Sequence, residues 1–206
     1  MKKVVLVGYS GHALVVAEIL HRMGREIAGY CDLEAQADNR LGIPFLGHEI
    51  GDAGLEYLRR EDYFVAIGDN HRRHRVVRSL DERGIKKPLT IVHPDAVVAT
   101  SSSIGVGCMI APSAVVNPFA TIGEGVICNS GCIIEHECRV GEFSHIAPGA
   151  VLAGNVSVGD HSFVGANTVV KEGVSIGADC TVGAGSVIIR NIPDGTKVVG
   201  NPGRIL

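Results

Sequence analysis

The sequence predicts two successive architectures, a small parallel α/β sheet followed by a solenoid of short parallel strands. Residues 104–193 repeat with a period of six over ninety residues, without an insertion. The segment before them alternates apolar runs with helical patterns. The 206 residues include 27 Gly and no Trp, which suits short strands joined by tight corners. A fixed stride of this length is the signature of a repeat architecture.

The N-terminal part is expected to alternate strands and helices. Continuous apolar runs indicate buried strands, and apolar residues at helical spacing indicate helices. This reading predicts strands over 3–7, 26–32, 43–46, 63–67 and 89–92, and helices over 13–23, 48–60 and 71–83. Strands that alternate with helices form a parallel sheet, so this segment is expected to be a Rossmann-like α/β domain.

Three segments should meet at the carboxyl edge of that sheet, where α/β proteins bind ligands. They are Ser10-Gly11-His12, Asp32 and Gly68-Asp69-Asn70. The first turn reads GxxGH and not GxGxxG, so it gives little support for an NAD site. Its backbone N–H groups could hold a phosphate at a helix start. Asp32 could accept hydrogen bonds from a ribose or a base. The alternative is an ordinary turn with a helix cap.

A basic cluster follows the third of these segments. It comprises residues 71–75 (HRRHR) together with Arg78. At helical spacing these side chains cover more than one face, so most of the cluster is expected to be solvated. Contact with a phosphate is the less favoured interpretation.

The six-residue blocks predict a triangular coil. The first place is aliphatic in every block except at Cys128, and the fifth place is small or β-branched. Both places face the same side of a strand, because side chains alternate with period two. Three blocks close a coil of eighteen residues, so residues 104–193 give five coils over about 24 Å. The repeat is expected to begin near Val98.

Cysteine is used as a core residue in this pattern. Five of the six cysteines fall on first or fifth places, where a thiol acts as a small apolar filler: Cys108, Cys128, Cys132, Cys138 and Cys180. No CxxC pair occurs. A disulfide framework and a cysteine zinc site are therefore disfavoured.

The net charge of the chain and its distribution limit the classes of function that are expected. A net charge of -3 argues against general nucleic-acid binding. Residues 1–97 carry 14 basic and 14 acidic side chains, whereas residues 98–206 carry 5 and 8. The start, MKKVVLVGYSGHA, is too short an apolar run for a signal peptide or a membrane span, so a cytoplasmic protein is expected.

The candidate chemistry lies at His136. This residue occupies the third place of its block, a corner place, between Glu135 and Glu137. A corner side chain projects from the coil, and a nearby carboxylate makes an imidazole a stronger base. In an extended chain both acids would point away from the ring, but a corner changes these directions. Either acid can therefore be its partner. His145 lies nine residues further along.

These residues carry a family resemblance. Residues 134–145 (IEHECRVGEFSH) and 153–156 (AGNV), with 8–12 (GYSGH) and 66–70 (AIGDN), resemble the NeuD/PglD family of hexapeptide-repeat sugar acetyltransferases. Within it, the likeness is greatest to the UDP-4-amino-sugar N-acetyltransferases of bacillosamine synthesis, a branch of glycan biosynthesis. The likeness spans essentially the whole chain. It implies a sugar-nucleotide-binding domain over 1–92, and a left-handed parallel β-helix that binds acetyl-CoA over 93–206, with a C-terminal tail. It also implies a homotrimer with sites between subunits.

The resemblance also assigns roles by position. It matches His136 to the catalytic base and Glu137 to the residue that raises its basicity. It matches the sugar-nucleotide contacts to Ser10, Gly11, His12, Asp32 and Gly68. It matches the acetyl-CoA contacts to Asn129, His145, Ala166 and Ala184. The chain departs from the family pattern at Cys31, which replaces an acid, at Ala184, which replaces glycine, and in a longer loop over 34–44.

The expected reaction transfers acetyl from acetyl-CoA to the 4-amino group of a nucleotide-linked 4-amino-4,6-dideoxy sugar. His136 would act as general base for direct attack on the thioester, and the reaction would need neither an acyl-cysteine nor a metal. Two enzyme alternatives are an O-acetyltransferase acting on sialic acid or serine, and an N-acetyltransferase of GDP-perosamine.

Two further alternatives come from other classes. One is a scaffold protein that uses the solenoid surface without catalysis. The other is a zinc enzyme of the carbonic-anhydrase type, which would require His136, His145 and His161 to converge. The trimer is also expected from apolar sixth places at Val115, Ile127 and Val151, since exposed apolar rows mark interfaces.

Overall fold

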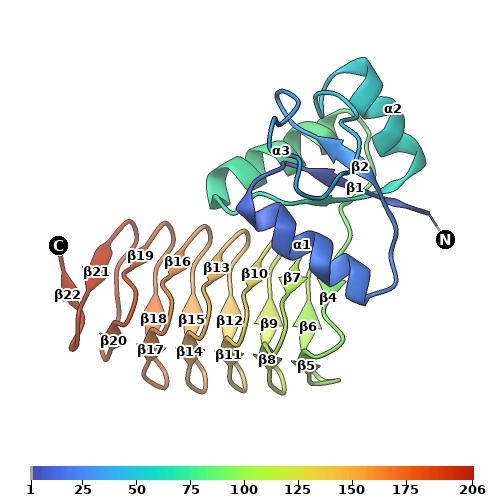
Figure 1. Cartoon of the computed structure of the whole chain (residues 1–206). Helices are drawn as coiled ribbons and strands as arrows, with labels where there is room; N and C mark the ends of the chain where they lie inside the picture. Colours follow the sequence, from blue (N-terminus) through green and yellow to red (C-terminus); the bar gives the residue numbers. More distant parts are fainter. Residues whose placement is uncertain (1) are drawn as a thin grey trace. The chain divides into compact units, whose positions relative to one another are not determined.

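The structure is a computed structural model that describes residues 2–206. The chain divides into two compact units, Met1–Ile91 and Val92–Leu206. Within the described residues, no helix combines the length and the apolar character that crossing a bilayer requires. Figure 1 shows the α/β unit in blue to green and the solenoid in green to red.

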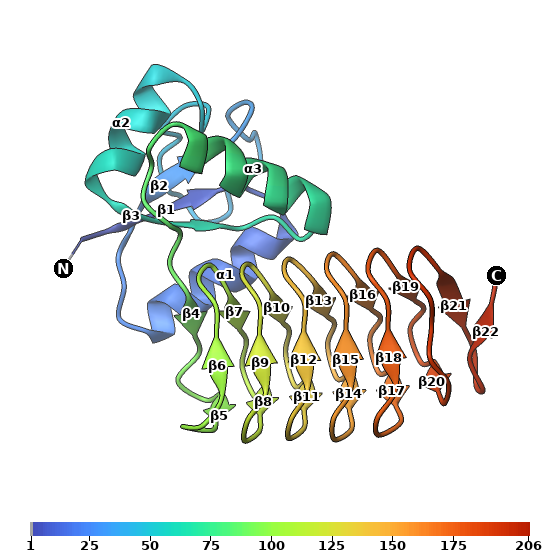
Figure 2. The same cartoon turned by 180° about the vertical axis from the view of Figure 1, so that it is seen from behind.

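The N-terminal unit is a three-stranded parallel sheet with the strand order β2-β1-β3. Helix α1 covers one face, and α2 and α3 cover the other (Figures 1 and 2). Its elements are β1 (Val4–Val7), α1 (Gly11–Arg22), β2 (Ile27–Cys31), α2 (Asp52–Arg60), β3 (Asp62–Val65) and α3 (Asn70–Glu82). The predicted alternation of strands and helices is confirmed, because the apolar runs form fully buried strands.

Two of the predicted N-terminal strands are wrong. The segment 43–46 forms only an isolated bridge between Tyr30 and Phe45, because Pro44 has no N–H with which to continue a ladder. The segment 89–92 does not join this sheet. Its end, β4 (Ile91–Val92), is the first strand of the solenoid. A two-residue solenoid strand has the same apolar pattern as the end of a sheet strand, so the sequence did not separate them.

The solenoid has three flat faces of parallel strands (Figure 2). Face 1 contains β4 (Ile91–Val92), β7 (Met109–Ile110), β10 (Ile127–Cys128), β13 (His145–Ile146), β16 (Phe163–Val164), β19 (Thr181–Val182), β21 (Lys197–Val199) and β22 (Arg204–Ile205). Face 2 contains β5 (Val97–Val98), β8 (Val115–Val116), β11 (Ile133–Ile134), β14 (Val151–Leu152), β17 (Val169–Val170) and β20 (Val187–Ile188). Face 3 contains β6 (Ser103–Ile104), β9 (Thr121–Ile122), β12 (Arg139–Val140), β15 (Ser157–Val158) and β18 (Ser175–Ile176).

The chain visits faces 1, 2 and 3 in turn, so three strands make one coil and residues eighteen apart lie in register. Six coils result, of which the last closes face 3 with a bridge between Ile176 and Ile192. The expectation of five coils was one too few, because the repeat begins at Ile91 and not near Val98. The early corners at Pro94 and Thr100 lack the glycines that mark later ones.

The core consists mainly of the second residue of each parallel strand and the small residue that directly precedes the strand. The inward cysteines are all buried and free, as the pattern predicted. Inward serines satisfy their hydroxyls within the stack. Ser144 donates to the carbonyl of Gly159 at 2.7 Å and accepts from the N–H of Ser162 at 3.0 Å. Ser162 repeats this arrangement with Gly177 and Cys180, so polar atoms of the core are paired.

The outer rows of faces 2 and 3 differ in character. Face 2 presents a β-branched aliphatic residue at the start of every strand: Val97, Val115, Ile133, Val151, Val169 and Val187. Face 3 presents polar residues at the same places: Ser103, Thr121, Arg139, Ser157 and Ser175. The expectation that Ile127 belongs to the exposed apolar row is wrong. Successive blocks fall on different faces, and Ile127 is buried on face 1.

Candidate functional site

His136 and Glu137 form the two-residue turn between face 2 and face 3, the second corner of the third coil. The Nδ1 atom of His136 lies 3.2 Å from Oε2 of Glu137. The partner of the imidazole is therefore Glu137 and not Glu135. Glu137 has a left-handed backbone with φ of 62°, which turns its side chain toward the preceding ring. The alternation of an extended strand could not reveal this direction.

This contact determines which ring nitrogen is available as a base. A carboxylate only accepts hydrogen bonds, so Nδ1 of His136 carries the proton and donates it to Glu137. Nε2 then keeps its lone pair. The side chain of His136 is 53% exposed, so a reactant can reach the ring. An accessible imidazole with a fixed tautomer meets the chemical requirements of a general base.

Gly154 lies one coil after His136 on the same corner. A Cβ atom built on Gly154 would lie 2.6 Å from both Cε1 and Nε2 of the imidazole. Contacts this short do not occur in real side chains, so the ring can hold this position only because residue 154 is glycine. Gly154 belongs to the segment 153–156 that carries the family resemblance, but its steric role is visible only in the fold.

Asn129 and His145 form a second polar pair, on face 1 and at its edge. Oδ1 of Asn129 accepts from the N–H of Ser130 at 2.8 Å, which turns Nδ2 toward Nε2 of His145 at 3.0 Å. Because the amide nitrogen donates, Nε2 of His145 accepts and the ring is neutral in this contact. The ring also meets Phe163 edge to face, with centroids 5.1 Å apart.

Ala166 and Ala184 occupy the corner between face 1 and face 2, the first corner, in successive coils. The carbonyl of Ala166 accepts from the N–H of Gly185 at 2.8 Å, which fixes the stacking of these turns. Asn129 comes directly before the first corner of an earlier coil. The four residues expected to contact acetyl-CoA thus follow the first corner and the adjoining edge of face 1. His136 belongs to the second corner, across face 2.

His136, His145 and His161 do not form a metal triad. His136 is on the second corner, His145 on face 1, and His161 on the third corner, where its ring stacks on Phe143 with centroids 6.1 Å apart. A tetrahedral zinc ion needs three ligand nitrogens at about 2 Å from one point. Residues on separate corners of a rigid prism do not meet this requirement.

In the N-terminal unit, the carboxylate of Asp32 joins two of the predicted segments. Oδ2 accepts from the N–H of Tyr9 at 2.9 Å, and Oδ1 accepts from the N–H of Leu33 at 2.8 Å. The guanidinium of Arg72 lies 3.7 Å from Oδ1. Asp32 therefore holds the turn after β1 against the end of β2, in addition to any contact with a ligand.

Most of the basic cluster is exposed, as expected, but Arg73 is an exception that supports the third segment. Its side chain is buried, at 1% exposure, because it donates to the carbonyls of Ile67 and Gly68, each at 3.1 Å. Nη2 also donates to Oδ1 of Asn70 at 2.9 Å. Burial and the charge of Arg73 lower the pKa of His12 to about 4, so His12 is neutral at pH 7.

A cavity of about 290 Å³ opens beside the turn after β1. Ser10 and Gly11 line it, whereas His12, Asp32 and Gly68 do not. The hydroxyl of Ser10 makes no capping hydrogen bond to α1. The opposite wall comes from the loop after β2, through Gln36, Asp38 and Arg40. The length of this loop is visible in the sequence, but none of its residues was predicted to belong to a site.

Two segments of the chain match known protein families. The PglD N-terminal domain matches residues 3–80, and the hexapeptide repeat of succinyl-transferase matches residues 155–190. A comparison with curated protein sequences finds no significant match.

Solved structures resemble the whole chain. PerB from Caulobacter crescentus, in complex with CoA and GDP-perosamine, is 38% identical with a TM-score of 0.91, covering 100% of this chain and 98% of that one. The acetyltransferase domain of PglB from Neisseria gonorrhoeae, in complex with acetyl coenzyme A, is 34% identical with a TM-score of 0.92, covering 100% and 99%. WeeI from Acinetobacter baumannii shares the fold at 24% identity and a TM-score of 0.85, covering 100% of both chains.

A parallel α/β unit followed in the sequence by a hexapeptide-repeat left-handed β-helix defines a hexapeptide-repeat acyltransferase. The chain belongs to the PglD/NeuD family of sugar N-acetyltransferases.

Proposed function

We propose that this enzyme transfers acetyl from acetyl-CoA to the 4-amino group of a nucleotide-linked 4-amino-4,6-dideoxy sugar, with His136 as general base. The observation that carries the proposal is the contact of Nδ1 of His136 with Glu137, which leaves Nε2 free to accept a proton. The bound CoA and GDP-perosamine of PerB and the acetyl coenzyme A of PglB support the two substrate classes.

In this mechanism Nε2 of His136 removes a proton from the sugar amine as its nitrogen attacks the thioester carbonyl. Glu137 holds the ring in the required tautomer and stabilises the imidazolium that forms. The imidazolium then protonates the departing CoA sulfur. Positioned general-base catalysis of this kind contributes about 10²–10⁴-fold to the rate.

A covalent acyl-cysteine intermediate is not part of the proposal. All six cysteines are buried in the described chain. Cys138 directly follows Glu137 of the second corner in the sequence. Burial raises the pKa of its thiol. A buried thiol held in its protonated form is a poor nucleophile. Direct attack on acetyl-CoA therefore suits this site better than a relay through cysteine.

The N-terminal unit is proposed to bind the nucleotide-sugar, through Ser10, Gly11, His12, Asp32 and Gly68. The cavity beside Ser10 and Gly11 supports the assignment of nucleotide-sugar binding to the N-terminal unit. A UDP-linked sugar of the bacillosamine type is the first candidate, and GDP-perosamine is the second because PerB contains it. O-acetylation of sialic acid is the third candidate. That reaction would depend more strongly on His136 as a base, since a hydroxyl is a weaker nucleophile than an amine.

A kinetic panel tests the acceptor. We expect acetyl transfer from acetyl-CoA to UDP- or GDP-linked 4-amino sugars, followed by release of free CoA thiol, and no transfer to free sialic acid. Transfer only to a sugar hydroxyl would replace the proposal by O-acetylation. Failure to bind acetyl-CoA in calorimetry would instead favour a scaffold.

We also propose a homotrimer with sites between subunits. The first corner, with the expected acetyl-CoA contacts, and the second corner, with His136, lie on either side of face 2. A site made from both corners is therefore completed more readily by a neighbouring copy. The outer row of face 2 is aliphatic, and its Val97 is 61% exposed, which suits a buried interface.

Paired substitutions within one coil test the interface. Val151→Arg places a charge on face 2, and Ser157→Arg places the same charge on face 3. We expect the first to dissociate the assembly in sedimentation and to abolish transfer, and the second to do neither. A stable monomer of the unsubstituted protein at micromolar concentration would contradict the proposal.

A further inference from the structure

Phe119 is the most exposed aromatic side chain of residues 2–206, at 69% exposure. It lies on the second corner of the second coil, in the turn that also contains Pro118. Residues at this place of the corner have a left-handed backbone in successive coils, with φ of 61° at Phe119, 62° at Glu137 and 55° at Asn155. This conformation favours glycine and asparagine, and a bulky side chain is rare in it.

Phe143 shows how the fold can stabilise a phenylalanine with such a backbone. Its φ is 53°, but its side chain is buried, at 2% exposure, and its ring stacks on His161 with centroids 6.1 Å apart. Packing therefore compensates for the strained turn at Phe143. Phe119 has no comparable burial, so the packing of its own chain does not account for an aromatic ring at this place. Strained backbone conformations of this kind are concentrated at active sites and ligand contacts.

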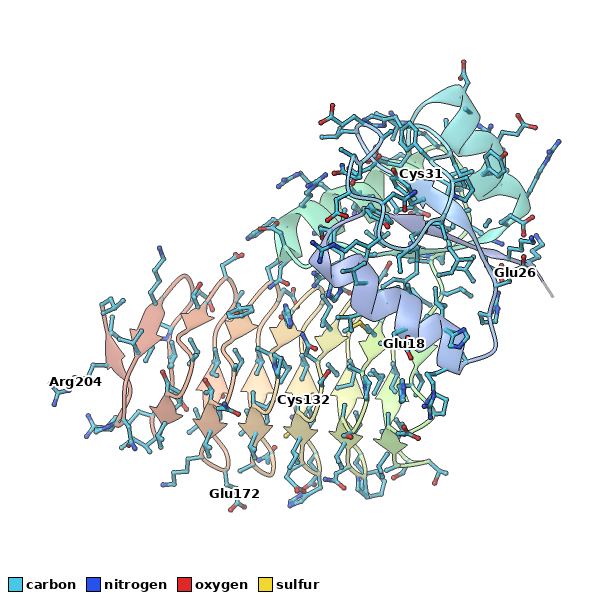
Figure 3. All side chains as sticks on the ribbon, in the orientation of Figure 1. Glu18, Glu26, Cys31, Cys132, Glu172 and Arg204 are labelled. Carbon is cyan, nitrogen blue, oxygen red and sulfur yellow. The ribbon has the colours of Figure 1, made fainter. Side chains whose placement is uncertain are left out.

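Phe119 lies next to the proposed base on the same corner. The N–H of Glu137 donates to the carbonyl of Pro118 at 3.1 Å, so the two turns stack directly. Phe119 is thus one coil before the turn that contains His136. Side chains of this corner project outward, as Figure 3 shows for Glu172, two coils after His136. The exposed surface that precedes the imidazole along the corner is therefore apolar.

The proposed acceptor carries an apolar group beside its reacting amine. In a 4-amino-4,6-dideoxy sugar the amine is on C4 and a methyl group is on C5, and staggered bonds place the two about 3 Å apart. An amine nitrogen in hydrogen-bond contact with Nε2 of His136 therefore brings this methyl group to within about 6 Å of Nε2. A methyl group at that distance is within reach of an aromatic ring whose backbone lies one coil, or about 4.8 Å, away.

We propose that Phe119 contacts the methyl group on C5 of the acceptor sugar and makes the enzyme selective for 6-deoxy sugars. The inference rests on the proposed function, because it takes a 4-amino-4,6-dideoxy sugar as the acceptor. Burial of a methyl group against an aromatic ring is favourable, whereas a 6-hydroxyl in the same place would lose its hydrogen bonds to water. Phe119 thus determines specificity, and the proton transfer stays with His136.

Acceptors that differ only at C6 test the assignment. We would measure kcat/KM for UDP- and GDP-linked 4-amino-4,6-dideoxy sugars and for their 6-hydroxy counterparts, with the native enzyme and with Phe119→Ala. The native enzyme should prefer the 6-deoxy sugar about tenfold, as expected for one methyl group in an apolar contact. Phe119→Ala should lose most of this preference, through a lower kcat/KM for the 6-deoxy acceptor. The same preference in both enzymes would overturn the inference.

Val106→Ala is the matched control, since Val106 is an apolar side chain of the third corner with 42% exposure. It should keep the native preference. Phe119→Asn suits the positive φ and should also lose the preference, with a melting temperature no lower than native.

Two further measurements separate the contact from other roles of the ring. Sedimentation should be the same for Phe119→Ala and the native protein, and dissociation in this variant would overturn the inference by assigning the ring to a subunit interface. In proton NMR of the bound 6-deoxy sugar, the methyl signal should shift upfield with the native enzyme and not with Phe119→Ala. Because this signal requires binding only, a failure of acetyl transfer would not be confused with a failure of this inference.

Discussion

A Cβ atom on Gly154 would lie 2.6 Å from Nε2 of His136, although eighteen residues separate the two positions. The proposed base therefore depends on the residue one coil further along its corner for space on its reactive side. Gly154 leaves space at Nε2 of the imidazole, whereas Glu137 contacts Nδ1. Strand register, and not sequence proximity, brings these groups together.

The first prediction concerns this glycine. Gly154→Ala should displace the imidazole and lower kcat at least tenfold, because general-base catalysis requires the ring within hydrogen-bond reach of the amine. Steady-state kinetics and thermal unfolding would be compared. Gly173→Asn is the control, since its Cβ would meet nothing within 4 Å and asparagine tolerates its positive φ of 71°. An unchanged kcat in Gly154→Ala would show that the ring has other room.

The second prediction concerns the base itself. His136→Ala should lower kcat by about 10²–10⁴-fold and change the melting temperature little. The side chain is more than half exposed, so its removal leaves no cavity in the core. Circular dichroism and kinetics of the same preparation check both parts. Native kcat in this variant would refute the assignment of His136.

The third prediction separates the two acids that flank His136. Glu137→Gln should lower kcat about tenfold, since an amide orients the imidazole less strongly than a carboxylate does. Glu135→Gln should have little effect, because Glu135 makes no contact with the ring. Glu137→Asn should lower kcat similarly without loss of stability, as asparagine is common at a positive φ. Equal losses from both glutamates would indicate a general effect of charge.

The fourth prediction assigns acceptor recognition to the N-terminal unit. Asp32→Ala removes the acceptor of two backbone N–H groups and should raise KM for the nucleotide-sugar about tenfold. KM for acetyl-CoA should stay within twofold. The pair is measured by varying each substrate at saturation of the other. A parallel rise in both values would mean that the turn after β1 also supports the donor site.

The fifth prediction concerns pH and stability. Burial raises the pKa of Asp62, but hydrogen bonds from Lys86 and Arg25, at 2.6 and 2.7 Å, outweigh it and hold this pKa below the ordinary 3.8. A lowered folded-state pKa gives stability that is present above pH 3.8 and is lost as pH falls through the folded value. Asp62→Asn should therefore destabilise the N-terminal unit at pH 7 by about 1–3 kcal/mol.

The same variant should unfold with a weaker dependence on pH below 3.8 than the native protein. Asp81→Asn is the control, because Asp81 and Lys87 are both about half exposed. An exposed pair contributes little, so this change should be nearly neutral. Denaturant unfolding at several pH values, followed by a probe in the N-terminal unit, distinguishes the two.

Periodicity was sufficient to predict the solenoid, because aliphatic first places and small or β-branched fifth places recur every six residues over ninety residues without an insertion. It could not place the first coil, since Pro94 and Thr100 do not mark their corners with glycine. The conformation of Glu137 was not predicted either, although Gly125, Gly131 and Gly149 occupy the same place of other blocks and also have a positive φ. The burial of Arg73 within a mostly exposed basic cluster was not predicted either. Its charge predicts exposure, but the carbonyls of Ile67 and Gly68 that bury it are supplied by the fold.

Because of the eighteen-residue register, the number of coils between two residues of one corner also sets their separation along the prism. His136 and Arg190 occupy one corner, so the length between them is counted in whole coils and not adjusted by local bending. Inserting a copy of one coil between them would repeat every inward contact and lengthen this separation by about 4.8 Å. A solenoid of this kind can therefore be lengthened or shortened by duplication or deletion of one coil, with its core left intact.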